Sequence, residues 1–574
     1  MAGLSSGMPN LSGTPIIILR DTRRETGKEA IFNNIMAARA VANIVRSTLG
    51  PKGMDKMLVD TVGDVTITND GVTILKEMEV QHPAAKMIIE ASKTQDTEVG
   101  DGTTTVAIFA GELLKKAEDL LNQNVHPTVI VQGYRMASDR AVEILGTLTR
   151  DVSKKDRTLL EKIAMTAMTG KWAASPDSKI PKYAVDIVLA AAETTDGKTT
   201  VDMDDILVEK KVGESVEDSE LIKGIVLDKG VVHSNMPKKV TNAKIALLSA
   251  PIEAKDTETK AEISITSAGQ FQEFAAMEKE AIRAVVDKVL ASGANVVFTQ
   301  KGIDDMAQQY LAQAGVLALR RVKKADLDRL SKATGANILT SLDELNSSEL
   351  GSAEVVEERS VGNGIMTFVT GAKNSEAVTL LLRGGTQQVL RSLDRALDDA
   401  VHAVVDAIED QKLVAGGGAT EIELSLRLRE YASTLKGREQ LAALKFAEAM
   451  EIVPRTLAEN AGFSSIDKLV ALKKSHETDK MAGLDAYTGK VTNMWDAGVV
   501  EPLRVKIQAV LSATDAATLI LRIDDVLAST KKRPEGPASA GMGGMPPGMM
   551  GGMGGMGGMG GMGMPGMMGM GGMR

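Results

Sequence analysis

The chain has 574 residues, of which 43% are hydrophobic and 25% are charged, and its formal net charge is −9. This balance is typical of soluble globular proteins, and its length predicts roughly three or four domains. The acidic balance argues against a nucleic-acid binder, which needs a basic face. The absence of cysteine excludes disulfides and cysteine nucleophiles. Because there is no signal-peptide pattern and no run of about 18 apolar residues, we expect a cytoplasmic protein without membrane contact.

Residues up to about 150 are predicted to be mainly helical. One face of the segment 29–49 carries apolar side chains at helical spacing, namely Ile31, Ile35, Ala38, Ala42 and Val45. The stretch "STLGPKGMD" (47–55) then turns at Gly50-Pro51. In "TITNDGVTIL" (66–75), Asp70-Gly71 separates two alternating runs, which predicts a β-hairpin, and Asp70 is free for a second role there.

The stretch "GDGTTT" (100–105) separates two helical patterns. The first N–H groups of a helix lack partners and carry positive partial charge, and glycine lets a ligand approach the backbone. Thr103 to Thr105 would therefore face an anion, while Asp101 offers oxygen ligands to Mg²⁺. A phosphate chain with its metal fits every group, but a threonine-capped helix–turn–helix without a ligand fits the motif as well.

From about 200 to 375, β-rich runs alternate with helices, and long helical patterns then continue to about 530. This order indicates an α/β domain inserted into a helical one. The stretch "VAGGGATEIELSLRLREYA" (414–432) is a triple glycine that opens a helix. Residues 541–574 are almost entirely glycine and methionine, which predicts a disordered tail. The tail is either a flexible end without a role or a segment whose methionines contact partners weakly.

Seven motifs of this chain, in this order and spacing, resemble the group II chaperonin family of thermosome type. They are "TLGPKGMDKMLVD", "TNDGVTIL", "QHPAAKMI", "GDGTTTV", "VVHSNMPKK", "LLLRGGT" and "VAGGGATE". The resemblance covers residues 15–530, and the tail rich in "GGM" fits as well.

The resemblance implies a multidomain α and α/β chaperonin fold. It has a mainly helical equatorial ATPase domain, a small intermediate domain, and an inserted α/β apical domain with a helical protrusion. The implied limits are 1–151 and 411–530 (equatorial), 152–219 and 374–410 (intermediate), 220–373 (apical, with the protrusion at about 254–280) and 531–574 (tail).

The resemblance also implies residue roles in ATP binding and hydrolysis. Asp101 matches the metal-binding aspartate, and Asp70 and Asp399 match two aspartates that position the attacking water. Lys171 resembles a lysine that senses the γ-phosphate, although the residues after it diverge from the family. Nucleotide contacts are matched by Leu49, Gly50, Pro51, Gly102, Thr103, Thr104, Thr105 and Gly417, and by Glu501 near the ribose.

The implied function is an ATP-dependent chaperone that uses ATP and Mg²⁺ and encloses non-native polypeptides. The implied assembly is two stacked rings, commonly of eight identical or paralogous subunits. The runs "PIIIL" and "ATLILRID" (517–524) are predicted to be short exposed β-edges that pair with a neighbour. The protrusion is predicted to act as a built-in lid that meets neighbours or clients through Ile263, Ile265, Phe271 and Phe274, with Ser267 as a helix N-cap. Two alternatives are a metabolic ATP-using enzyme and a passive ring scaffold.

Overall fold

A computed structural model describes residues 22–171, 178–253, 268–373 and 377–529. The chain divides into two compact units, residues 1–24 with 527–574, and Glu25–Val526. Strands β1 (Thr22–Thr26) and β20 (Asp525–Ser529) pair in a two-stranded sheet at the limits of these units. Every other described element lies in the second unit, which is treated by itself below.

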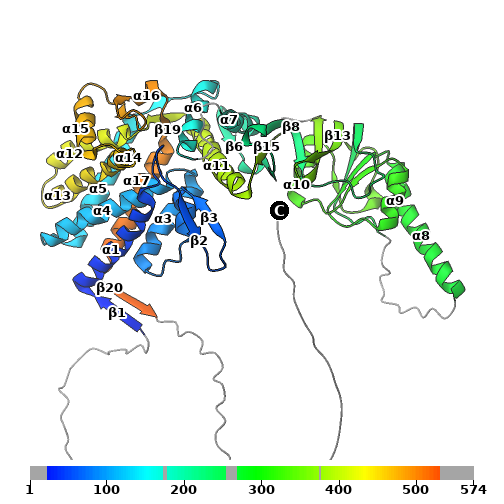
Figure 1. Cartoon of the computed structure of the whole chain (residues 1–574), viewed down its shortest axis with the longest axis horizontal. Coiled ribbons are helices and arrows are strands. Elements are labelled where there is room, and N and C mark those ends of the chain that lie inside the picture. Colours follow the sequence, from blue (N-terminus) through cyan, green and yellow to red (C-terminus); the bar gives the residue numbers. More distant parts are fainter. Residues whose placement is uncertain (1–21, 172–177, 254–267, 374–376, 530–574) are drawn as a thin grey trace, which may run out of the picture. The chain divides into compact units, whose positions relative to one another are not determined.

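Helices from the beginning and the end of the second unit share one hydrophobic core (Figure 1). This core contains residues from Ile31 to Leu148 and again from Leu424 to Leu521, so two distant parts of the chain fold as one body. Its helices are α1 (Gly27–Arg46), α2 (Gly71–Glu77), α3 (Pro83–Val99), α4 (Thr103–Asn122), α5 (Pro127–Thr147), α12 (Ala419–Thr434), α13 (Glu439–Met450), α14 (Ile452–Asn460) and α17 (Leu503–Leu521). Helices α15 (Ser465–Ser475) and α16 (Met494–Ala497) pack in two smaller clusters with residues of α12. Short strands accompany them, namely β2 (Lys56–Val59), β3 (Val65–Thr68), β4 (Arg150–Asp151), β16 (Lys412–Ala415), β17 (Ala482–Leu484), β18 (Val491–Asn493) and β19 (Val500–Pro502).

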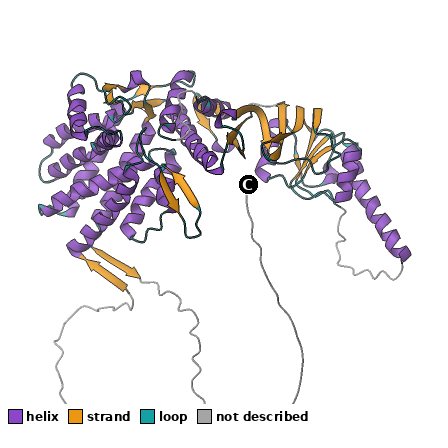
Figure 2. Cartoon of the chain, viewed as in Figure 1, coloured by secondary structure: helices purple, strands orange, loops and turns teal. Residues whose placement is uncertain are grey.

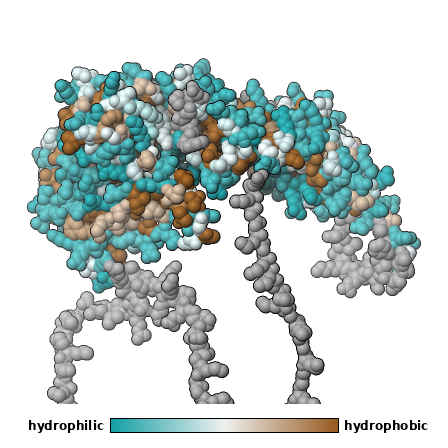
Figure 3. Space-filling view, viewed as in Figure 1, coloured by the Kyte–Doolittle hydropathy of each residue, from teal (hydrophilic) through white to brown (hydrophobic). Residues whose placement is uncertain are grey.

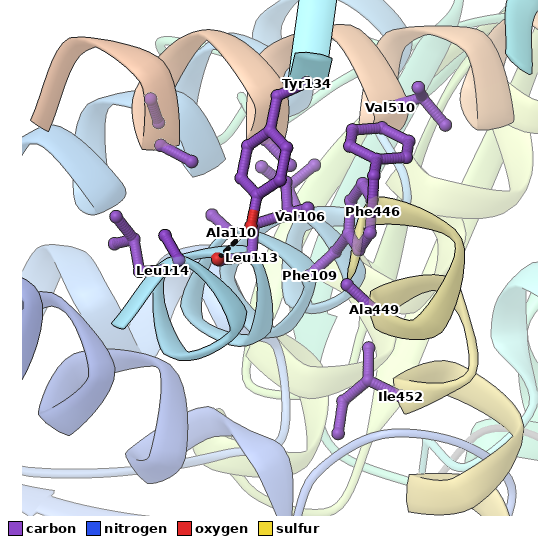
Figure 4. Packing of buried hydrophobic residues seen from close by; sticks show 14 of the residues in the cluster. Val106, Phe109, Ala110, Leu113, Leu114, Tyr134, Phe446, Ala449, Ile452 and Val510 are labelled. Atoms are coloured by element: carbon purple, nitrogen blue, oxygen red, sulfur yellow. Dashed lines mark hydrogen bonds between the residues drawn. The ribbon is translucent and has the colours of Figure 1, made fainter. Parts of the chain in front are cut away.

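An aromatic cluster forms the centre of this core (Figure 4). The Phe446 ring contacts the edges of Phe109 and Tyr134, with ring centroids 5.5 and 5.7 Å apart. The Tyr134 hydroxyl donates a hydrogen bond to the Leu113 carbonyl oxygen at 2.8 Å. Phe446 lies on α13, whereas the other three lie on α4 and α5, so the cluster joins the two parts of the chain.

A second core surrounds the long helix α11. Buried leucine, valine and alanine side chains line one face of α11 and pack against α6 and α7. The elements around this core are α6 (Arg157–Met168), α7 (Ile180–Ala191), β5 (Ala192–Thr195), β6 (Lys198–Val201), η1 (Met203–Asp205) and α11 (Gln387–Asp410).

A nine-stranded mixed sheet occupies the middle of the sequence (Figure 2). Its order is β11-β10-β9-β13-β14-β8-β15-β7, and β12 also pairs with β9. Strands β10, β11 and β12 run parallel to their partners, whereas β13, β14 and β8 pair in antiparallel fashion. The elements are β7 (Leu207–Val212), η2 (Val216–Asp218), β8 (Glu220–Leu227), β9 (Lys239–Leu248), α8 (Ala268–Ala291), β10 (Val296–Thr299), α9 (Asp305–Gln313), β11 (Leu317–Leu319), α10 (Lys324–Thr334), β12 (Ile338–Leu339), η3 (Leu342–Glu344), β13 (Gly351–Val361), β14 (Gly364–Ala372) and β15 (Val378–Gly384).

Helix α8 is half packed and half exposed. From Ile282 onward its apolar residues Ile282, Val286 and Val289 are buried in a core with β10 and α9. Before Ile282, every residue of α8 whose side chain is described is exposed, and Phe274 and Met277 are 39% and 57% exposed. Ile263, Ile265 and Ser267 lie outside the described residues, as does the side chain of Phe271.

Two predictions about β-structure are wrong. The chain forms no hairpin at Asp70-Gly71, because the Asp70 side chain caps α2 by accepting from the Thr73 N–H; the hairpin is β2–β3 instead. Residues 517–521 are not an exposed β-edge but the last turns of α17, where Ala517, Ile520 and Leu521 are buried at helical spacing. The stretch "PIIIL" lies outside the described residues.

Candidate functional site

The "GDGTTT" stretch forms a tight turn between α3 and α4. Gly100 ends α3 with φ 66° and Gly102 precedes α4 with φ 81°, conformations that favour glycine. The Asp101 carboxylate accepts the Gly102 N–H at 2.6 Å. Gly102 provides no side-chain cap for the first N–H groups of α4, and a helix N-terminus of this kind can bind an anion.

Asp70 lies beside the "GDGTTT" turn, at the N-terminus of helix α2. One oxygen of its carboxylate accepts from the N–H and the hydroxyl of Thr73, at 2.9 and 2.6 Å, and the other lies 3.4 Å from the Thr103 hydroxyl. A Cβ on Gly71 would come within 2.4 Å of the Thr104 hydroxyl oxygen, so only glycine lets α2 approach α4 this closely. The N-termini of α2 and α4 therefore face one site.

Lys171 and Asp399 form an ion pair in which both side chains are nearly buried. Lys171 follows α6, and Asp399 lies in the middle of α11. Burial lowers the pKa of Lys171, and the negative charges of Asp101 and Asp70 oppose this decrease. The Asn69 side chain, next to Asp70, donates to the carbonyl oxygen of Gly170, next to Lys171. His402, three residues after Asp399, lies against Gly100, which precedes Asp101. The ion pair therefore lies beside Asp70 and Asp101.

The Leu49-Gly50-Pro51 turn contacts this site through Gly170. A Cβ on Gly170 would lie 2.5 Å from the Gly50 carbonyl oxygen. Asn69 donates to the Gly170 carbonyl oxygen at 2.6 Å, and Asn460 on α14 donates to the Leu49 carbonyl oxygen at 2.8 Å. The two asparagines fix the turn and the segment before Lys171, and neither was predicted from the sequence.

Gly417 and Glu501 lie where β16 and β19 pair, Glu501 within β19 and Gly417 just after β16. In this antiparallel pair Glu501 is opposite Val414, and Val414 lies two residues before Gly416. Gly417 has φ 61°, and a Cβ there would overlap Met494. Burial raises the pKa of Glu501, Lys506 opposes this increase, and the charge of Asp101 adds to it. Gln95 donates to the carbonyl oxygens of both Asp101 and Val505, so the segment that follows Glu501 lies beside the "GDGTTT" turn.

Two further side chains connect the segments, and no sequence pattern pointed directly to either. Gln95 on α3 donates to the Asp101 carbonyl oxygen at 2.8 Å and to the Val505 carbonyl oxygen at 3.2 Å. His402 on α11 lies directly against Gly100. A polar residue on an otherwise apolar helix face often indicates a side chain that connects two segments, but the pattern does not identify the segment that it contacts.

The donor set fits a nucleotide and its metal. Within the described ranges, no three His, Asp or Glu side chains are grouped as a metal cage. Asp101 is one carboxylate beside a helix N-terminus that has no side-chain cap. Mg²⁺ usually binds one or two carboxylates together with phosphate oxygens, so Asp101 and a phosphate chain would suit this ion. Among the helices described, none combines the length and apolarity that crossing a membrane requires.

The sequence pattern of the TCP-1/cpn60 chaperonin family matches residues 41–531. The chain belongs to this family. This chaperonin is similar to the thermosome subunit beta of Archaeoglobus fulgidus, with 57% identity over 541 residues, covering 94% of this chain and 99% of the relative. It is also similar to the thermosome subunit of Pyrococcus horikoshii, with 54% identity over 538 residues, covering 93% and 98%.

A solved structure, the open-state monomer of a group II chaperonin from Methanococcoides burtonii, matches with a TM-score of 0.55 and 52% identity. The match covers 74% of this chaperonin and 100% of that chain. The multidomain α and α/β chaperonin fold expected from the sequence is confirmed. The protein is a group II chaperonin with ATP-dependent chaperone function and ATPase activity, and it acts on client proteins as an oligomeric assembly.

Proposed function

We propose that this chaperonin binds ATP with Mg²⁺ at the N-terminus of α4 and hydrolyses it there. One observation carries the proposal: the four segments that hold Asp70, Asp101, Lys171 and Asp399 contact one another around this helix end, through Asp70 with Thr103, Asn69 with Gly170, and His402 with Gly100. A passive ring scaffold has no need for these side chains, and a metabolic ATP-using enzyme would need a second set of convergent polar residues for its small substrate.

Each group has a role that follows from its chemistry. Asp101 would hold Mg²⁺, which supplies charge neutralisation on the phosphates. The N–H groups and hydroxyls of Thr103, Thr104 and Thr105, with the backbone at Gly102, would bind phosphate oxygens. The turn at Leu49, Gly50 and Pro51 and the glycine turn at Gly417 would border the nucleotide, and Glu501 would accept from the ribose.

Asp70 and Asp399 would orient the attacking water and accept its proton. Both are carboxylates beside the phosphate turn, one on α2 and one on α11, so a water between them is oriented from two sides. Lys171 would leave Asp399 for the γ-phosphate when ATP is present, because a phosphate carries more negative charge than one carboxylate. Hydrolysis would therefore respond to the position of α11.

We propose that the domains follow the limits expected from the sequence. The equatorial domain comprises 1–151 and 411–530, the intermediate domain 152–219 and 374–410, and the apical domain 220–373, with a protrusion at about 254–280 and a tail at 531–574. Separate hydrophobic cores for the helical body, for α11 and for the sheet support this division. The exposed first half of α8 supports a protrusion.

We propose an assembly of two stacked rings, commonly of eight subunits, that encloses non-native polypeptides in the cytoplasm. An exposed apolar surface on the β2–β3 hairpin supports contact between subunits. Met57, Val59, Val65 and Ile67 are between 41% and 67% exposed, and Figure 3 shows apolar atoms gathered where this hairpin lies. Monomeric proteins rarely expose such a patch without a partner.

The test is Asp399→Ala with Asp394→Ala as the matched control. Both substitutions remove one carboxylate from α11, but Asp394 pairs with Lys210 on β7, whereas Asp399 pairs with Lys171. We expect Asp399→Ala to bind ATP nearly as well as the unmodified protein and to lose at least about a hundredfold in single-turnover hydrolysis. Asp394→Ala should keep both properties. Near-normal hydrolysis in Asp399→Ala would refute the assignment, and native mass spectrometry of the same samples would test the rings.

A further inference from the structure

One face of helix α11 is turned toward the proposed ATP site. Arg395, Asp399 and His402 are spaced by four and three residues, which places their side chains in one row along the helix. The His402 ring lies against Gly100, and Asp399 forms the ion pair with Lys171. Arg395 is the next residue of this row, one turn before Asp399. The row therefore places a basic side chain next to the proposed catalytic aspartate.

The turn that carries Asp70 lies beside the same helix. Helix α11 contacts strand β3, which ends two residues before Asp70 (Figure 1). Asn69, in this turn, donates to the Gly170 carbonyl oxygen at 2.6 Å, and Gly170 directly precedes Lys171. Burial lowers the pKa of Arg395, and Asp70 is the acid that opposes this decrease most. The turn at Asp70 and the row on α11 therefore border the same site.

Arg395 has no hydrogen bond or ion pair with any residue that the structure describes, although it is half-buried. The acids nearest to it in this part of α11 have other partners, since Asp394 pairs with Lys210 and Asp399 with Lys171. A guanidinium group offers five N–H donors, and partly buried donors are normally satisfied. The arrangement makes better sense if an anion from outside the chain binds Arg395. The phosphate chain of the proposed site is such an anion.

We propose that Arg395 is a catalytic residue whose guanidinium group binds the γ-phosphoryl oxygens of ATP while that group passes to water. This inference rests on the proposed function and adds a residue to it. The water oxygen forms a bond to the γ-phosphorus, the bond from this phosphorus to the oxygen of ADP breaks, and ADP keeps that electron pair. The water proton passes to one of the two carboxylates. Arg395 forms no covalent bond; its donors neutralise charge on the transferring group.

The position of Arg395 explains why it would act during transfer. Arg395 and Asp399 lie one turn apart on one helix, so a movement that brings Asp399 to the phosphates carries Arg395 with it. The donors of a guanidinium group lie in one plane, which suits two oxygens of a phosphoryl group better than an ammonium group does. The same movement of α11 would therefore deliver the carboxylate that orients water and the charge that stabilises the transition state. Binding of ADP would need neither.

The experiment measures binding of Mg·ADP to Arg395→Gln, alone and with two phosphate analogues. Aluminium fluoride imitates the planar phosphoryl group during transfer, and beryllium fluoride imitates the γ-phosphate before transfer. The affinity for ADP with aluminium fluoride should fall by at least about thirtyfold, that for ADP with beryllium fluoride by about threefold or less, and that for ADP alone should not change. Single-turnover hydrolysis should fall by at least about a hundredfold. Arg395→Lys, which keeps the charge without the planar donors, should recover only part of the rate.

Arg391→Gln is the matched control. Arg391 lies one turn before Arg395 on α11 and likewise has no hydrogen bond or ion pair within the described ranges, but it is exposed. Its substitution removes the same charge from the same helix, and exposed charges are screened by salt, so each affinity should stay within about twofold. Because Arg395→Gln leaves no partner unpaired, its melting temperature should match that of the unmodified protein.

The outcomes separate this inference from the function on which it rests. If the unmodified protein binds neither ATP nor ADP, the proposed function fails and this inference fails with it. If the unmodified protein hydrolyses ATP and Arg395→Gln does so at a near-normal rate, this inference alone is refuted. Equal losses of affinity with the two fluorides would also refute it, since Arg395 would then support a conformation of α11 and not the transferring group. An equal loss in Arg391→Gln would refute it as well, because the total charge of α11 would be the cause.

Discussion

The imidazole ring of His402 lies directly against Gly100, so that a Cβ on Gly100 would come within 2.3 Å of the ring. Gly100 precedes Asp101 in the "GDGTTT" turn, and His402 lies three residues after Asp399 on α11. The contact therefore joins the proposed metal-binding turn to the helix that carries a proposed catalytic aspartate. The His402 ring is held in place by a hydrogen bond of 2.8 Å to the Asp398 carbonyl oxygen.

We expect Gly100→Ala to reduce single-turnover ATP hydrolysis by at least about tenfold. The substitution adds a methyl group where His402 leaves no room, and φ 66° costs a non-glycine residue about 1 kcal/mol or more. Gly100→Ala with His402→Ala should recover part of the activity, because the overlap is removed while the backbone strain remains. His402→Ala alone is the control for the loss of the ring. Full activity in Gly100→Ala would show that the contact does not set the geometry of the site.

The aromatic cluster of the helical core should be a main source of its stability. Phe446 is fully buried and contacts Phe109 and Tyr134 across the two parts of the chain. We expect Phe446→Ala to destabilise the protein by about 3–5 kcal/mol, as large-to-small changes of buried aromatic residues do. Tyr134→Phe, which removes only the hydrogen bond to Leu113, should cost about 1 kcal/mol. Denaturation monitored by circular dichroism measures the free energy of unfolding of both variants. Equal decreases in the two variants would contradict this account of the core.

Elements were predicted correctly where neighbouring residues determine the structure. Predictions were wrong where the same residue pattern fits two different structures. The start of α4 was predictable because two glycines and an apolar periodicity agree. Asp70-Gly71 was misassigned to a hairpin because an aspartate before a glycine suits a tight turn and a helix N-cap equally well. The end of α17 was misassigned because a short apolar run fits a strand or a buried helix.

The candidate site was less accessible to sequence reasoning than the fold. The physics of a helix N-terminus indicates Asp101 and the threonines after it. Nothing local distinguishes Asp399 from the other acids of α11, and only the family resemblance identified it. His402 and Gln95 act through contacts with residues far away in the sequence, which no periodicity reports.

The first half of α8 should be needed for enclosing substrate and not for assembly or hydrolysis. Its Phe274 and Met277 are exposed, and among the described residues neither belongs to a hydrophobic cluster. Replacing 258–276 by a short Gly-Ser loop should keep rings and ATPase activity, yet leave substrate open to protease in the presence of ATP. Phe274→Ser with Met277→Ser is a milder variant, and Ile282→Ala, which weakens the buried half of α8, is its control. Full protection of substrate in the loop variant would exclude a lid at this position.

Asp406, near the end of α11, should make stability depend on pH. The pKa of Asp406 is raised to about 7, mainly by burial; Arg504 opposes this increase, and the neighbouring Asp410 and Glu409 add to it. Arg504 binds one oxygen of Asp406 at 3.0 Å, while the other oxygen is buried without a partner and can carry a proton. Because the folded state binds this proton more tightly than the unfolded state, the contribution is full below about pH 4 and is lost as the pH rises through about 7.

Asp406→Asn should remove this dependence while keeping the hydrogen bond from Arg504. Relative to the unmodified protein, the variant should gain stability steadily between about pH 4 and pH 7, by an amount on the order of 1 to 4 kcal/mol. The difference between the two melting temperatures, measured at several pH values, isolates the effect because all other titrating groups are shared. A constant difference across this range would mean that Asp406 is ionised in the folded protein throughout. Arg504 would then balance the burial of the carboxylate completely.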